Sequence, residues 1–108
     1  MMQVSWESAA RAFFDQLSKR EQTLVERSLT RLANNWEQRE CRHLLQRLRD
    51  LASKDGHPIF QLRVGRDLRV LLYRQGQLMV VDIVRHGQIE GLRSVSGLRP
   101  WGSLSELD

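Results

Sequence analysis

The sequence predicts an α+β fold in which an N-terminal helical hairpin packs on one face of a small antiparallel β-sheet. Two observations predict it: apolar residues recur with a helical period up to Trp36, and from Ile59 onward they alternate with a period of two. The 108 residues correspond to one domain, and a hydrophobic content of 41% is sufficient for one core. We therefore expect a single domain over residues 1–93 and a polar, partly disordered tail over residues 94–108.

Two helices are expected in the first third of the chain. The first begins near Ser5, and its apolar face consists of Trp6, Ala9, Ala10, Phe13, Phe14 and Leu17. Ser18 and Glu21 have the S-x-x-E spacing of a capping box, which predicts the start of a second helix. Its apolar positions are Leu24, Val25, Leu32, Ala33 and Trp36. The short link between the helices requires an antiparallel hairpin.

The region between Asn35 and Gly56 has a weaker helical pattern. A third, shorter helical face is indicated by Cys41, Leu44, Leu45, Leu48 and Leu51. The chain has a single cysteine, which excludes an intrachain disulfide and a zinc site with several thiolates. We expect Cys41 to be a small core residue. The absence of an export signal or a membrane span in the sequence, together with this cysteine usage, favours a reducing cytoplasmic location without membrane association.

From Ile59 the alternation predicts a three-stranded antiparallel meander. The expected strands are residues 59–64, 68–73 and 77–84, joined by turns at 65–67 and 75–76. Residues 1–4 and 89–92 are expected to add short edge strands.

The two faces of the meander differ in charge. The uncharged face, which we expect to meet the helices, consists of Phe60, Leu62, Val64, Leu68, Val70, Leu72, Met79, Val81 and Ile83. The opposite face then carries Gln61, Arg63, Arg69, Leu71, Tyr73, Val80, Asp82, Val84 and His86. A β-bulge near Val84 would place Arg85 there instead of His86. Asp82 is expected to pair with an arginine across the sheet.

Charge and chemistry on this face indicate an anionic partner. The net charge is +4, and all but two of the 17 cations are arginines, since Lys19 and Lys54 are the only lysines. Arginines on neighbouring strands can contact a phosphate, and an imidazole can move protons near neutral pH. RNA carries its own nucleophile, so its cleavage requires no metal. Asp67 and Asp82 lie too far apart in the pattern for a metal site. The alternative interpretation is a solvated basic surface without a ligand.

The residues from Phe60 to Tyr73, FQLRVGRDLRVLLY, resemble the strand motif of the RelE/ParE superfamily of bacterial toxins. Members of this family have a short strand, a helical hairpin and an antiparallel meander, which agrees with the order expected over residues 1–93. RelE-like members are metal-independent endoribonucleases that cut mRNA, commonly on the ribosome. The resemblance thus implies an mRNA endoribonuclease that needs no cofactor.

The resemblance also implies site residues. Arg69 matches the strand arginine that contacts the scissile phosphate, Arg63 matches its companion, and Arg85 and His86 lie where members place a catalytic arginine or histidine. The expected RNA-binding residues are Arg47, Arg49 and Lys54 of the preceding helix and loop, with Gln61 and Tyr73 of the sheet.

The same resemblance leaves the branch of the family open. RelE-like sequences often have a tyrosine where this chain has Ile89, and the pair His86-Gly87 is similar to the end of the corresponding strand in ParE members, which inhibit DNA gyrase. The alternatives are therefore a gyrase inhibitor or a catalytically inactive module that binds an antitoxin or nucleic acid. In the toxin branches the expected partner is a cognate antitoxin protein. The RelE-like branch adds mRNA and the ribosome.

Overall fold

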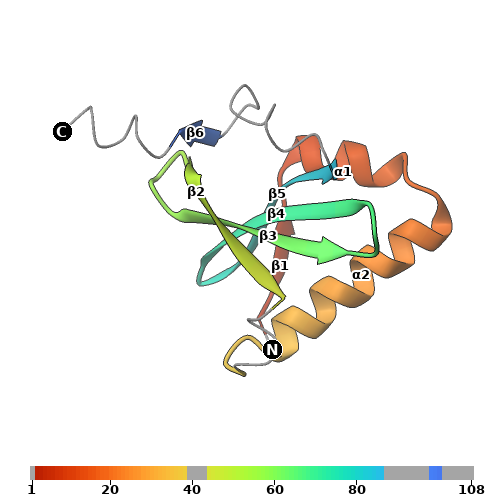
Figure 1. Cartoon of the computed structure of the whole chain (residues 1–108). Coiled ribbons are helices and arrows are strands. Elements are labelled where there is room, and N and C mark those ends of the chain that lie inside the picture. Colours follow the sequence, from red (N-terminus) through yellow and green to blue (C-terminus); the bar gives the residue numbers. More distant parts are fainter. Residues whose placement is uncertain (1, 39–43, 87–97, 101–108) are drawn as a thin grey trace.

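A mixed β-sheet with two helices forms the α+β fold of this chain in a computed structural model, which describes residues 2–38, 44–86 and 98–100 (Figure 1). The elements are β1 (Val4–Trp6), α1 (Ser8–Asp15), α2 (Lys19–Asn34), β2 (Leu45–Ser53), β3 (Pro58–Val64), β4 (Leu68–Gln75), β5 (Gln77–Arg85) and β6 (Leu98–Pro100). The strands lie side by side in the order β1-β5-β4-β3-β2-β6. Every pairing is antiparallel except that of β1 with β5, so the sheet is mixed, whereas the sequence predicted an antiparallel one.

The N-terminal strand is displaced along the chain from its expected position at residues 1–4. Val4–Trp6 pairs in parallel with β5, and the amide of Glu7 still donates to the carbonyl of Val80 at 2.9 Å. Because residues 4–7 are engaged in these backbone bonds, the first helix begins at Ser8 and not near Ser5. Trp6 nevertheless reaches the helix, because its ring lies 5.0 Å from that of Phe14.

The capping box at the start of α2 is confirmed. The hydroxyl of Ser18 accepts from the amide of Glu21 at 3.2 Å, and the carboxylate of Glu21 accepts from the amide of Ser18 at 3.3 Å. Both bonds satisfy amides that have no partner inside the helix. The buried side chains of α2 are Val25, Leu29, Leu32 and Ala33. Leu24, which was expected on the buried face, is exposed.

The third helix was a wrong prediction, because the segment forms β2. Residues 45–48 pair antiparallel with residues 59–62 of β3, which satisfies backbone groups along that edge of the meander. The register shifts between Leu48 and Ala52, so β2 contains an irregularity there. Cys41 lies outside the described residues.

The meander of β3, β4 and β5 is confirmed. Gly65 and Gly76, in the two connecting turns, have φ angles of 63° and 70°, a conformation that favours glycine. The expected strand at residues 89–92 lies outside the described residues. Within the expected tail, β6 pairs antiparallel with residues 51–53 of β2, and the rest of residues 94–108 is not described.

Both faces of the sheet carry a hydrophobic cluster. On the helix side, buried residues of α1 and α2 join Leu62, Val64, Leu68, Val70, Leu72, Leu78, Val80 and Ile83. On the other side, buried residues form a second cluster of Leu51, Ile59, Leu71, Tyr73, Val81 and Val84. The expected face was therefore wrong for Met79, Val80 and Val81. The register shift opposite Leu71 and Leu72 explains this, because one extra residue in β5 exchanges the two faces.

Candidate functional site

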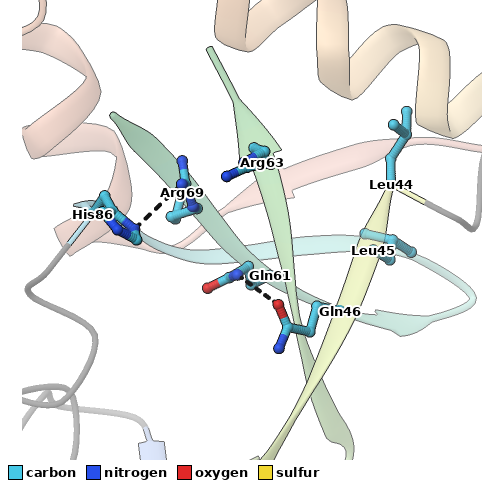
Figure 2. Close-up of a pocket in the computed structure, with 7 residues that line it drawn as sticks. All are labelled: Leu44, Leu45, Gln46, Gln61, Arg63, Arg69 and His86. Atoms are coloured by element: carbon cyan, nitrogen blue, oxygen red, sulfur yellow. Dashed lines mark hydrogen bonds between the residues drawn. The ribbon is translucent and has the colours of Figure 1, made fainter. Parts of the chain in front are cut away.

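The face of the sheet that points away from the helices contains a pocket of about 330 Å³ (Figure 2). It lies beside the second cluster, where β2, β3, β4 and the end of β5 run next to one another. The lining residues are Leu44, Leu45, Gln46, Gln61, Arg63, Arg69 and His86. Four of the residues that the sequence predicted as functional, Gln61, Arg63, Arg69 and His86, therefore lie together.

Two arginines form the cationic part of the pocket. Arg63 on β3 and Arg69 on β4 are direct partners across the antiparallel pair. Like charges in this relationship destabilise a sheet. The side chain of Arg63 is exposed, whereas only 2% of Arg69 is exposed. The pocket thus has one accessible guanidinium and one buried guanidinium.

The buried guanidinium of Arg69 is held by oxygen and nitrogen acceptors. One of its nitrogens, Nη1, donates to the carbonyl of Leu68 at 2.8 Å, and both terminal nitrogens lie 3.5 Å from the carbonyl of Arg66. Its Nη2 lies 3.3 Å from Nδ1 of His86. In the described part of the chain, no carboxylate forms an ion pair with Arg69. A buried charge without a counterion is costly and is typical of sites that bind an anion.

The contact between Arg69 and His86 indicates which tautomer of the neutral imidazole fits the pocket. A guanidinium has no acceptor, so Nδ1 of His86 must accept this hydrogen bond. The neutral ring then carries its hydrogen on Nε2. His86 itself is exposed, and it follows the last residue of β5.

Two glutamines lie on the β2 side of the pocket. Nε2 of Gln61 donates to Oε1 of Gln46 at 3.1 Å across the β2–β3 pair. Oε1 of Gln61 is buried and has no hydrogen-bond partner in the part of the chain that the structure describes. Figure 2 shows this oxygen pointing toward the side of the pocket where His86 lies. A buried acceptor without a partner among the described residues therefore lies beside the cationic groups of the pocket.

Arg85 was expected to be catalytic, but the structure separates it from the pocket. Its Nη1 donates to Glu21 at 3.1 Å and to Asp67 at 2.7 Å, and it does not line the pocket. The hydrogen bond from Arg85 is the main cause that lowers the pKa of Glu21, and the two carboxylates raise the pKa of Arg85. Arg85 and His86 are adjacent in sequence and lie on opposite faces, so they do not share one site.

The other expected RNA-binding residues lie outside the pocket. Arg47 and Arg49 belong to strand β2 and not to a helix, and Lys54 follows β2 in the turn. All three side chains are exposed. Tyr73 is a member of the second cluster, 7% exposed, with its ring stacked 5.3 Å from that of His57. Burial raises the pKa of the Tyr73 phenol, and its ring is not available to stack on a base.

Among the described residues, no arginine pairs with Asp82, contrary to expectation. Its Oδ1 accepts from the amide of Ile83 at 2.8 Å, and burial raises the pKa of this carboxyl. Across residues 2–38, 44–86 and 98–100, no group of three His, Cys, Asp or Glu side chains is arranged to hold a metal ion. No helix in those residues is long and apolar enough to cross a membrane.

Sequence reasoning missed the part of the pocket that β2 supplies. Leu45 and Gln46 of β2, and Leu44 just before it, were assigned to a helix, in which they would not face Gln61. The pairing of Gln46 with Gln61 across two strands brings them there. A strand assignment for residues 45–53 would have identified this pair.

Comparisons with known proteins give a structural similarity but no family. Neither the scan against protein-family models nor the search of curated proteins finds a match. The chain is similar to the solution structure of the conserved hypothetical protein HP0894 from Helicobacter pylori, with 9% sequence identity and a TM-score of 0.46. The alignment covers 82% of this chain and 99% of that chain.

Proposed function

We propose that this protein is a metal-independent endoribonuclease that cleaves mRNA and acts as the toxin of a type II toxin–antitoxin system. The observation that supports it is the buried charge of Arg69, which has no counterion in the described chain and lies opposite Arg63 in a pocket with His86. Two like charges held together stabilise a ligand of opposite charge, and a phosphodiester is such a ligand.

The arrangement assigns a role to each group. Arg63 contacts the phosphate, and the phosphate takes the Nη2 hydrogen bond of Arg69 away from His86. This frees the lone pair of Nδ1 to accept the proton of the 2′-hydroxyl. The 2′-oxygen attacks phosphorus, the bond to the 5′-oxygen breaks, and the imidazole returns the proton to that oxygen. The products are a 2′,3′-cyclic phosphate and a 5′-hydroxyl.

Cleavage in the presence of a chelator tests this function. The purified chain is incubated with mRNA and EDTA, with and without ribosomes, and the new ends are mapped. We expect 5′-hydroxyl ends, and a rate that falls by about 10²–10⁴-fold in His86→Ala and strongly in Arg63→Ala. Arg74→Met is the control, because Arg74 is an exposed arginine that does not line the pocket. Intact RNA in both reactions would contradict the proposal, and inhibition of DNA supercoiling with uncut mRNA would indicate a gyrase inhibitor.

A second candidate is an RNA-binding module without cleavage. It is favoured by the hydrogen bond that occupies Nδ1 of His86 and by the low exposure of Arg69. If this candidate holds, the chain binds RNA with a salt dependence that Arg63→Gln weakens, and the RNA remains intact. Time courses of binding and cleavage on the same RNA separate the two candidates.

The proposed partner is an antitoxin with an acidic segment that covers the pocket. Such a segment would offer carboxylates to Arg63 and to the charge of Arg69. Co-expression with the protein encoded by the neighbouring reading frame is expected to abolish cleavage. The recovered complex should dissociate more readily at high salt.

A further inference from the structure

Arg85 joins two elements that lie far apart in the sequence. Its Nη1 donates to Glu21 at the start of α2 and to Asp67 in the turn between β3 and β4. The side chain of Arg85 is 41% exposed, and that of Asp67 is 54% exposed. We name Glu21, Arg85 and Asp67 the Arg85 bridge.

The turn that the Arg85 bridge holds is also in contact with the pocket. The carbonyl of Asp67 accepts from the amide of His86, and the carbonyl of Arg66 accepts from the guanidinium of Arg69. Two pocket residues are therefore hydrogen-bonded to the backbone of residues 66–67, while Arg85 binds the side chain of Asp67. The turn begins at Gly65, whose φ of 63° lies in the left-handed region that favours glycine.

We propose that Arg85 is a positioning residue, which fixes the turn at Gly65–Asp67 and thereby sets Arg69 and His86 for the reaction. This inference rests on the proposed function. Exposed ion pairs contribute little to stability, so the main effect of the Arg85 bridge is on geometry. Small displacements of catalytic groups lower rates strongly, which makes this geometry measurable.

The atoms of the Arg85 bridge suggest a conservative variant that should retain its effect. Both carboxylates are bound by the same nitrogen, so the ammonium of a lysine can replace it. Arg85→Lys is expected to cleave RNA within about 3-fold of the unmodified chain. Arg85→Met is expected to lower kcat by about 10-fold or more while KM changes by less than about 3-fold, because the bridge does not line the pocket. The matched control is Arg74→Met, which removes an arginine of similar exposure that pairs with Glu37.

A second measurement does not require cleavage. Nitrogen-15 NMR of the ring reports whether His86 has the Nε2–H tautomer that the bond from Arg69 imposes. We expect this tautomer in the unmodified chain and in Arg85→Lys, and a mixture of tautomers in Arg85→Met. Assignment uses the spectrum of His86→Gln. If Arg85→Met does not fold, Asp67→Asn tests the same connection with Arg85 in place.

The outcomes separate the inference from the proposed function. If the unmodified chain cuts no RNA and the tautomer still changes in Arg85→Met, the proposed function fails and the structural connection stands. The positioning role is overturned if Arg85→Met keeps both the tautomer and kcat. It is also overturned if Arg85→Lys loses kcat as fully as Arg85→Met does.

Discussion

Arg63 and Arg69 are direct partners across β3 and β4, so two positive charges face the same pocket from adjacent strands. The next pair on the same face of these two strands is Gln61 with Leu71, which carries no charge, and the pairs of Leu62 with Val70 and Val64 with Leu68 face the helices. The repulsion is relieved when an anion binds between the two side chains. The pair of arginines is therefore expected to lower the stability of the free protein and to favour the binding of an anionic ligand.

The first prediction follows from that link. Arg63→Gln removes one of the two charges, and the unfolding free energy is expected to rise by about 0.5 kcal/mol. RNA affinity should fall, and the slope of log affinity against log salt should become shallower by about one. Urea unfolding and RNA binding at several salt concentrations measure the two effects. A loss of stability would show that the arginines do not repel each other.

A lysine at position 69 is not expected to replace Arg69 in RNA cleavage. Its guanidinium uses Nη1 and Nη2 for different acceptors, Leu68 and His86, which one ammonium cannot reach together. Arg69→Lys should therefore lose RNA cleavage, whereas Arg85→Lys retains it. Cleavage rates of the two variants, measured beside their thermal midpoints, check this contrast. Equal activity would mean that charge alone is needed at Arg69.

Gln61 is expected to show a trade-off between stability and binding. Its Oε1 is a buried acceptor without a partner among residues 2–38, 44–86 and 98–100, which costs about 1–3 kcal/mol. Gln61→Met removes this acceptor together with the hydrogen bond to Gln46, so we expect a net gain in stability. RNA affinity should decrease. Denaturation of the variant in parallel with RNA titration shows whether both changes occur, and a lower midpoint would argue against the free acceptor.

Because the second cluster is buried, truncating one of its side chains is expected to lower the stability of the fold substantially. This face points away from the helices and was expected from the sequence to be open. Leu71 on that face and Leu72 on the helix face are both fully buried. Leu71→Ala and Leu72→Ala should each lower the unfolding free energy by about 2–5 kcal/mol. Chemical denaturation is the measurement. A change below about 0.5 kcal/mol for Leu71→Ala would mean that this face is open to solvent.

Local patterns were sufficient to predict much of this fold. The capping box at Ser18 and Glu21 depends on residues three apart, and the meander depends on alternation within each strand. Both signals are contained in short segments of sequence. The grouping of Arg63, Arg69 and His86 followed from the same alternation, because the extra residue of β5 lies before Asp82 and the pairing from Asp82 to Arg85 is regular.

Other features depended on pairing that no local pattern encodes. Residues 45–53 have leucines at a spacing typical of a helix, yet they form β2 because β3 offers an unpaired edge. The register shift beside Leu71 exchanged the faces of Val80 and Val81, and no glycine or proline marks it. Because of these two differences, Gln46 was not included in the predicted site, and Tyr73 was expected on an open surface.

The last prediction concerns the stability of the fold at acidic pH. The folded-state pKa of Glu21 lies below its ordinary value, mainly because of the hydrogen bond from Arg85. Its ionised form therefore stabilises the fold, and this contribution is present above the ordinary pKa of 4.5 and is lost as the pH falls through the lower folded-state value. Glu21→Gln keeps an oxygen for the amide of Ser18 and loses the ion pair. The variant should therefore be less stable than the unmodified chain at pH 7 and nearly equal to it near pH 2, as measured by urea unfolding at both values. A difference that is the same at both pH values would show that the Glu21 carboxylate does not interact with Arg85 in solution.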